Sequence, residues 1–387
     1  MQTGNELAEI ALGFHQFEER SRQGSGVLDA EGFISIYCGG DRVVPRRYRS
    51  WDAVRADLAE LAARSGEGAD NPRAVLLAGM IKSLDTAARY YSGKSIPFET
   101  MVQDLVGGVT GTVPEDTLAE IGDELDALLV RRGIAGRDLG ERLRAWRETN
   151  LLDQDRVEAV FRELLAVSKA RTNKMVFDTG DYDIRLNWFE GLPFGARCDF
   201  DNGKMDINPA MRFTRAELKN LVCHEVYPGH STHMLFTRAE VDAGRSEKDA
   251  LLCAANALDG CIQEGIGDQG IRIIDWIEDL DDAIAFQLRR LRNGAKTSAA
   301  WRLMHDGWSD EAVASYLAQT AFSDEAGIRA FLLLAKHPFR GPFVSSYWTG
   351  SEAVGEVWDR LDTDGRARFI PFLCGQLQSP ASVRMFQ

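Results

Sequence analysis

The stretch from Thr214 to Met234 reads T-R-A-E-L-K-N-L-V-C-H-E-V-Y-P-G-H-S-T-H-M, and it places three of the chain's six histidines beside a glutamate. A helical His-Glu pair with a further histidine nearby is the pattern with which metallohydrolases bind zinc and position a general base. The variant here is H-E-x-x-P-G-H, so His230 follows His224 by six positions. The pattern predicts a metal site in this part of the chain.

The helix that carries His224 is predicted to break before His230. On a regular helix, residues six apart are turned roughly 240° from each other and cannot share an ion. Pro228 has no N–H to donate to the carbonyl of His224, and Gly229 allows the backbone to turn sharply. A break at this point would return His230 toward the metal.

A catalytic zinc needs a third protein ligand, and Glu264 is the candidate. Residues 250–274 are expected to be helical in their first half, and three glycines between positions 265 and 270 would let the metal or another helix approach. Asp268 shares a helix face with Glu264 and can accept a hydrogen bond from a ligating histidine. His233 is left open as a substitute ligand, a group behind the ligands or a substrate contact.

Three segments together resemble a known family. They are H-E-V-Y-P-G-H at 224–230, Q-E-G-I-G-D at 263–268 and P-F-V-S-S-Y-W-T-G at 342–350. This combination resembles the bacterial domain-of-unknown-function 885 family, a helical group similar to glutamate-type zinc metallopeptidases. The resemblance covers about the second half of the chain, and it implies a zincin-like fold of the gluzincin type.

The resemblance also implies roles for individual residues: His224, His230 and Glu264 as metal ligands, Glu225 as general base, and Tyr347 as a donor to the transition state. His337 and Arg340 precede Tyr347 in a segment rich in proline and glycine. Side chains of these types can supply an oxyanion donor and a clamp for a substrate carboxylate.

Composition limits the classes of partner. The chain has 387 residues and a net charge of −14, which argues against nucleic acid or an anionic membrane as a partner. No signal-like opening and no run of about 18 apolar residues occurs, so a cytoplasmic protein is expected. The six cysteines lack C-x-x-C spacing and are expected to be reduced and mostly buried.

The chain is predicted to be mainly α-helical, with a small antiparallel sheet before the metal-binding helix. Helix-period apolar residues indicate helices over residues 5–22, 51–65, 72–91, 114–132, 138–149 and 153–170. Residues 181–208 alternate polar and apolar around Asp201-Asn202-Gly203, which indicates a hairpin. Such an edge could pair with an extended substrate or could simply cover the core. Residues 1–175 are expected to form one wall of a cleft, and residues 176–387 the metal-binding catalytic region.

These observations favour a zinc-dependent, peptidase-like hydrolase that cleaves an amide bond in a peptide or a peptide-like small molecule. Glu225 would take a proton from the attacking water and pass it to the leaving amine. The alternative is a metal-dependent lyase or tailoring enzyme acting on a specialised metabolite with the same ligands. Two imidazoles and a carboxylate also suit iron or manganese. The substrate and the oligomeric state are not determined by the sequence.

Overall fold

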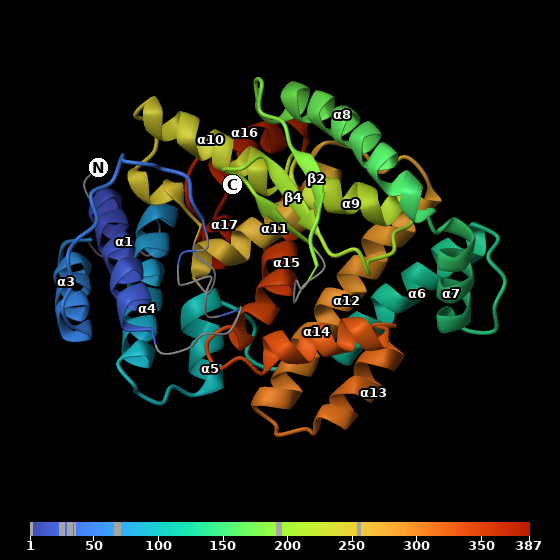
Figure 1. Cartoon of the computed structure of the whole chain (residues 1–387), viewed down its shortest axis with the longest axis horizontal. Coiled ribbons are helices and arrows are strands. Elements are labelled where there is room, and N and C mark those ends of the chain that lie inside the picture. The colour runs from blue at the N-terminus through green and yellow to red at the C-terminus, as the bar shows by residue number, and fades with distance from the viewer. Residues whose placement is uncertain are drawn as a thin grey trace. The chain divides into compact units, whose positions relative to one another are not determined.

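The computed structural model describes residues 3–22, 28, 34, 36–65, 71–190, 196–253 and 257–387. Most of these residues are helical, and the few strands form two small sheets, which confirms the mainly α fold class (Figure 1). None of the described helices combines the length and the apolar character needed to cross a membrane.

The six helices expected before residue 175 are present with nearly the predicted ends: α1 (Thr3–Ser21), α3 (Trp51–Arg64), α4 (Pro72–Tyr91), α6 (Glu115–Arg131), α7 (Leu139–Asn150) and α8 (Val157–Met175), the last preceded by a 3-10 turn at Gln154–Arg156. Local capping accounts for several starts. Ser50 accepts a hydrogen bond from the Ala53 N–H, and Asp138 accepts one from the Glu141 N–H.

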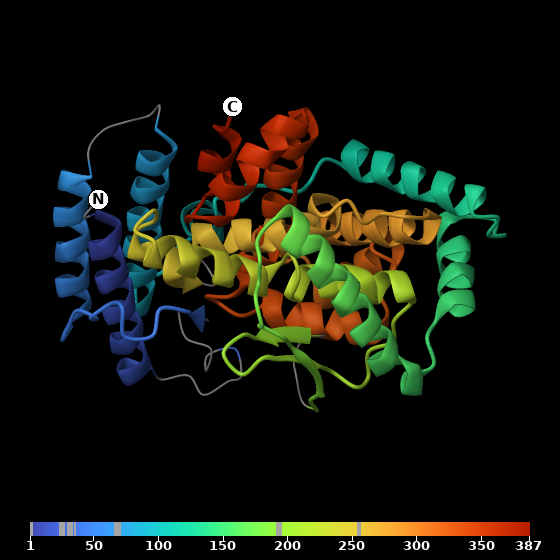
Figure 2. The ribbon, with the colours of Figure 1, turned by 90° about the horizontal axis from the view of Figure 1, so that it is seen from above.

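One compact unit comprises Met1–Thr110, His233–Gly265 and Leu334–Gln387. Its apolar core is centred on α1, α3 and α4, which lie side by side (Figure 2). Its other elements are β1 (Ile36–Tyr37), α5 (Phe98–Met101), a π-helical turn at Val102–Val106, a 3-10 turn at Lys248–Leu251, β5 (Leu252–Cys253), a 3-10 turn at Gly341–Phe343, α15 (Val344–Arg360), α16 (Thr363–Cys374) and α17 (Pro380–Arg384). Strands β1 and β5 pair antiparallel.

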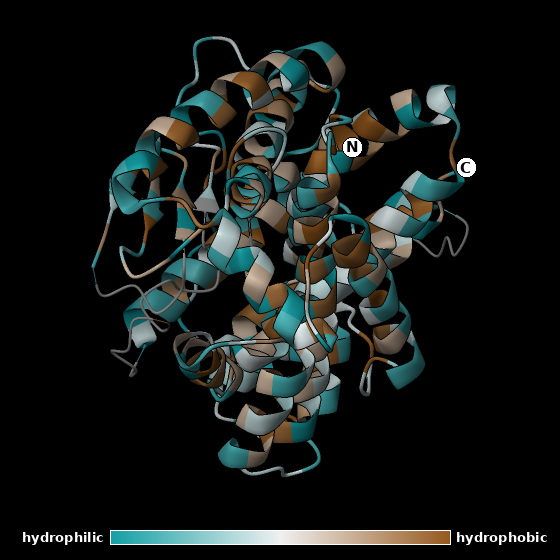
Figure 3. Cartoon of the chain, turned by 90° about the vertical axis from the view of Figure 1, so that its right-hand side faces the viewer, coloured by the Kyte–Doolittle hydropathy of each residue, from teal (hydrophilic) through white to brown (hydrophobic). Residues whose placement is uncertain are grey.

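The second compact unit comprises Gly111–Thr232 and Ile266–Leu333. Its long helix α12 (Leu280–Met304) packs against α6, α9 (Arg215–Glu225) and α13 (Asp310–Thr320). The bands of apolar and polar residues along the helices in Figure 3 are those of amphipathic helices with one buried face. Helix α14 (Glu325–Ala335) follows α13. Like α10 (His230–Asp242) and α11 (Leu258–Ile273), it has residues in both units. The division of the chain near residue 175 stays a prediction.

The sheet before α9 is mixed, so the prediction of a small antiparallel sheet is wrong in part. Its strand order is β2 (Arg185–Trp188), β4 (Lys204–Ile207), β3 (Ala196–Asp199). The β3–β4 hairpin is antiparallel as predicted, and Gly203 takes a φ of 55° in its turn. Strand β2 pairs in parallel with the other edge of β4, a non-local pairing that no turn signal encodes. Residues 191–195 of the predicted segment lie outside the described residues.

The segment from 250 to 274 also differs from expectation. Helix α11 begins only at Leu258 and continues to Ile273, so the helical part is the second half, glycines included. These glycines are required by packing: a Cβ on Gly265 would lie 2.3 Å from the Gly350 carbonyl oxygen of α15, within the first unit. A Cβ on Gly270 would lie 2.9 Å from the Cys223 carbonyl oxygen in the second unit. Close packing here outweighs the low helix propensity of glycine.

Candidate metal centre

The helix break predicted from Pro228 and Gly229 is confirmed. Helix α9 ends at Glu225, the Tyr227–Pro228 peptide bond is cis, and α10 begins at His230. A Cβ on Gly229 would lie only 1.8 Å from the His224 carbonyl oxygen, so a residue without a side chain is required. The capping box of Thr214 and Glu217 at the start of α9 is also formed.

Two hydroxyl groups donate to backbone carbonyls at the break. Ser231 Oγ donates to the Glu225 carbonyl at 3.1 Å, and Thr232 Oγ1 donates to the Val226 carbonyl at 3.1 Å. Because buried backbone carbonyls need partners, these bonds hold the ends of the two helices together. Ser231 therefore has a structural role between the metal-ligand candidates His230 and His233.

The structure brings His224, His230 and Glu264 together. One potential ligand atom from each lies within 4.8 Å of the others, and this is the one such group of three or more His, Cys, Asp or Glu residues found among the described parts of the chain. The His224 and His230 rings are 4.7 Å apart between centroids and nearly perpendicular. Two imidazoles and a carboxylate match the ligands of many catalytic zinc sites. The donor set fits zinc.

Helix α11 carries both Glu264 and Asp268, the carboxylate that contacts His224. A Cβ on Gly267 would lie 2.5 Å from His224 Nδ1, so the imidazole lies directly against the α11 backbone. One residue further, Asp268 places Oδ1 at 3.0 Å from His224 Nδ1. Glu264 precedes Asp268 by one helical turn and shares its face. The close approach at Gly267 thus places the His224 ring against the part of α11 that carries Glu264 and Asp268.

A buried network fixes Asp268. Arg289 Nε donates to Asp268 Oδ1 at 2.5 Å, and Asn293 Nδ2 donates to Oδ2 at 2.6 Å, both from α12. Burial alone raises the pKa of Asp268, but the Arg289 guanidinium and the His224 ring outweigh burial and hold that pKa below its ordinary value. Asp268 is therefore an anion that can orient His224.

His224 Nδ1 lies near both a hydrogen-bond donor and an acceptor. Arg289 Nη2 lies 2.8 Å from Nδ1, but this nitrogen cannot accept from Arg289 while donating to Asp268. We assign the tautomer in which Nδ1–H donates to the Asp268 carboxylate, because the charged acceptor is stronger; Nε2 is then available to a metal ion. Arg289 is held by its bond to Asp268 in either tautomer.

Glu225 is buried at the end of α9, directly after His224. Burial, followed by the nearby Glu225 charge, raises the pKa of the Cys198 thiol to about 12. The carboxylate is therefore close enough to β3 for its charge to act on Cys198. Cys198 Sγ is also 3.2 Å from Ser231 Oγ, which brings β3 against the start of α10.

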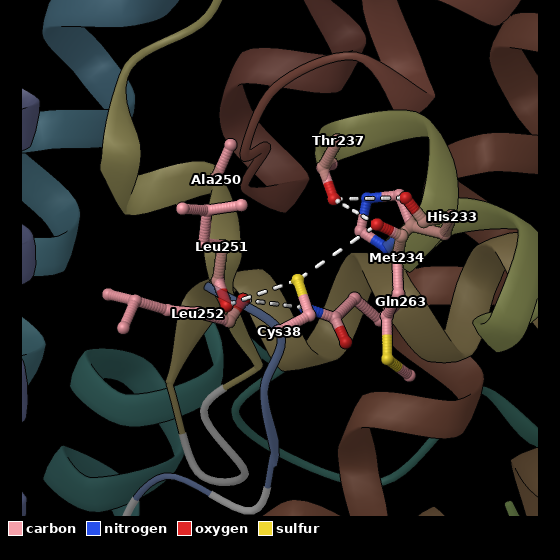
Figure 4. Close-up of a pocket in the computed structure, with 8 residues that line it drawn as sticks. All are labelled: Cys38, His233, Met234, Thr237, Ala250, Leu251, Leu252 and Gln263. Carbon is pink, nitrogen blue, oxygen red and sulfur yellow. Dashed lines mark hydrogen bonds between the residues drawn. The ribbon is translucent and has the colours of Figure 1, made fainter. Parts of the chain in front are cut away.

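His233 is not part of the cluster of ligand atoms. Its side chain lines a small pocket with Cys38, Thr237 and Gln263 among others (Figure 4). Burial lowers the pKa of His233 to about 4, so the imidazole is neutral at neutral pH. Its role as a group behind the ligands stays a prediction.

The late segment has local contacts that its sequence did not reveal. The backbone N–H groups of Phe339 and Arg340 donate to His337 Nδ1, at 3.3 and 3.0 Å, so this histidine caps a turn. Arg340 is buried, and its charge opposes the burial that raises the pKa of Tyr91 on α4. The catalytic roles of His337 and Arg340 stay predictions.

Tyr347 lies half-buried on α15, with its ring centroid 5.7 Å from that of Phe343. One turn later, Gly350 packs on α11: a Cβ there would lie 1.8 Å from the Cys261 carbonyl oxygen. Gly350 also contacts Gly265, the residue after Glu264. Helix α15, which carries Tyr347, therefore passes close to the turn of α11 that carries Glu264. Its role as a donor to the transition state stays a prediction.

Sequence reasoning missed the contribution of α12. Arg289, Asn293 and Lys296 lie at positions i, i+4 and i+7, a spacing that places them on one helix face. That spacing was visible in the sequence, but charged residues at helical intervals are usually a solvated face. Only the fold shows that this face reaches Asp268.

We expect Asp268→Asn to lower zinc affinity about 10- to 100-fold, because an amide orients His224 less strongly and loses the charge that supports the ligating tautomer. Competition with a zinc-binding dye measures the affinity, and circular dichroism checks the fold. Asp155→Asn, at an exposed position, is the matched control. Wild-type affinity in Asp268→Asn would show that the carboxylate has no role in metal binding.

Comparison with known proteins adds to the description of the fold. No protein-family model matches the sequence, and no curated protein matches it. Two solved structures are similar. The first is a protein from Colwellia psychrerythraea described as a "putative lipoprotein"; its TM-score is 0.56, and its sequence is 17% identical over 86% of this chain. The second is a protein from Shewanella oneidensis described as a "putative lipoprotein of unknown function"; its TM-score is 0.55, and its sequence is 14% identical over 86% of this chain. The chain spans 58% of the first protein's length and 72% of the second's. At these identities the similarity shows a shared fold.

Proposed function

We propose that this protein is a zinc-dependent hydrolase, peptidase-like in mechanism, that cleaves an amide bond in a peptide or peptide-like small molecule. The observation that carries the proposal is the grouping of ligand atoms of His224, His230 and Glu264 within 4.8 Å, beside the buried Glu225. A module that only binds a partner needs no general base next to its ligands. The proposal includes the zincin-like fold and the relationship to the domain-of-unknown-function 885 family suggested by the motifs.

His224, His230 and Glu264 would hold the metal, and zinc would supply Lewis acidity, which polarises a substrate carbonyl and lowers the pKa of water. Glu225 takes a proton from the attacking water and passes it to the leaving amine as the amide C–N bond breaks. Asp268 keeps the proton of His224 on Nδ1. Tyr347 donates a hydrogen bond to the oxyanion that forms when water adds to the carbonyl.

The position of strand β3 favours an extended peptide as the substrate. It is an edge strand of its sheet, and the contact between Cys198 and Ser231 brings it against the start of α10, where His230 lies. An edge strand presents unpaired backbone groups that can pair with an extended chain. A peptide bound along β3 would run past the metal ligands.

We therefore expect the zinc-loaded protein to cleave members of a library of extended peptides, with products identified by mass spectrometry. Metal analysis of the purified protein is the first measurement, and removal of zinc by a chelator should abolish cleavage. Fully metallated protein that neither cleaves the library nor binds it in competition would contradict the peptidase proposal. That result would favour the metabolite-directed alternative with the same ligands.

A further inference from the structure

Helix α12 carries a row of polar side chains on the face that reaches the metal centre. Arg289 and Asn293 on this face donate to Asp268, which contacts His224. Lys296 follows Asn293 by three residues, so its side chain continues the same face by one turn. The row thus leads away from the metal ligands along a single rigid helix.

The acidic side chains bonded along this row are engaged by cations other than Lys296. Asp268 is bonded to Arg289, and Glu217 pairs with Arg147 at 3.2 Å and only distantly with Arg292, at 3.8 Å. Within the residues that the structure describes, no hydrogen bond or ion pair engages the Lys296 ammonium. The charges of Asp268 and Asp324 act on Lys296 from a distance, without a bond to it.

Lys296 is half-buried, and Arg292 lies one helical turn before it. Burial, with the charges of Arg292 and Arg289, lowers the pKa of Lys296 to about 8. A partly buried ammonium with cations as neighbours is destabilised, and a negative charge placed there would relieve that destabilisation. The structure contains no acidic side chain bonded to Lys296 within its described residues, so a ligand can provide the charge.

We propose that Lys296, assisted by Arg292, binds a compact oxyanion of the substrate, a carboxylate or a phosphate, on the α12 face that contacts Asp268. The inference rests on the proposed function, since it names a part of that enzyme's substrate. Ammonium and guanidinium groups form charge-assisted hydrogen bonds with both kinds of oxyanion. The substrate class is then an acidic peptide or amide, whose negative group lies along the α12 face while the amide lies at the metal.

A matched pair of probes tests the proposal: one N-acetyl dipeptide with a free C-terminal carboxylate and the same dipeptide as its C-terminal amide. Binding is measured by calorimetry to zinc-loaded Glu225→Gln, in which turnover is expected to be lost, and to metal-free wild type. We expect the carboxylate probe to bind about 10- to 100-fold more tightly, the range for a hydrogen bond to a charged group. Inorganic phosphate serves as a competitor for the same site.

Lys296→Met should remove this preference, Lys296→Arg should keep part of it, and Lys174→Met, an exposed lysine on α8, should leave it unchanged. Stronger competition by phosphate than by the carboxylate probe, lost in Lys296→Met, would support the site and assign it to a phosphate ester. Equal binding of the two probes, no binding of either, or an unchanged preference in Lys296→Met would overturn the proposal. The metal-free wild type is measured in the same way. The carboxylate preference can therefore be detected even if the protein binds no zinc or hydrolyses no amide.

Discussion

Replacing Glu225 by glutamine is expected to lower the rate of hydrolysis by about 10²- to 10⁴-fold or more while bound zinc and fold are retained. Glu225 lies directly after His224, about 100° around the helix, so its carboxylate can reach the attacking water without being one of the grouped ligands. Glutamine preserves the shape and hydrogen-bonding capacity of the side chain but cannot take up a proton near neutral pH. Without a base, water would have to attack the carbonyl with its proton still bound.

The measurements are turnover of a cleaved peptide, zinc content and thermal unfolding. Glu163→Gln, the same change at an exposed position on α8, is the control and should retain full activity. Tyr347→Phe is expected to lose less, about 10²-fold, as for one donor to an oxyanion. If Glu225→Gln turned over the true substrate at the wild-type rate, the hydrolytic mechanism would be refuted.

Alanine at His224, His230 or Glu264 is expected to empty the metal site, because each substitution leaves only two protein ligands of the three. Zinc content after dialysis measures the loss, and apparent affinity should fall by several orders of magnitude. His233→Ala is the matched control on α10: its side chain lines the pocket with Cys38 and is not grouped with the ligand atoms. Loss of zinc in His233→Ala with retention in His230→Ala would reverse the ligand assignment.

Zinc content separates the two sets of variants. The ligand variants should lose metal and activity together, whereas Glu225→Gln should lose activity alone. Removal of a buried ligand also leaves space at the centre, so thermal unfolding should be compared without metal to exclude loss of fold as the cause. A ligand variant that unfolds like the metal-free wild type but binds no zinc is the expected result.

The sequence by itself determined the features that depend on neighbouring residues. The capping box at Thr214 and Glu217 started α9, Pro228 and Gly229 interrupted it, and the Asp201-Asn202-Gly203 turn formed the β3–β4 hairpin. Each is a short-range interaction between residues a few positions apart, so the local pattern contains its cause. For the same reason six of the helices before residue 175 were predicted close to their ends, whereas the short α5 was not predicted.

Features that depend on distant segments were decided only by the tertiary structure. Strand β2 pairs in parallel with β4, although β3 lies between them in the sequence. Helix α11 continues through its glycines because the His224 ring and the Gly350 backbone lie against it. Arg289 and Asn293 reach Asp268 from another helix. The path of α10 after the break decides that His230 joins the cluster, whereas His233 lines a pocket with Cys38. Local periodicity cannot encode these contacts, because each depends on where a remote backbone is placed by burial of the whole apolar core.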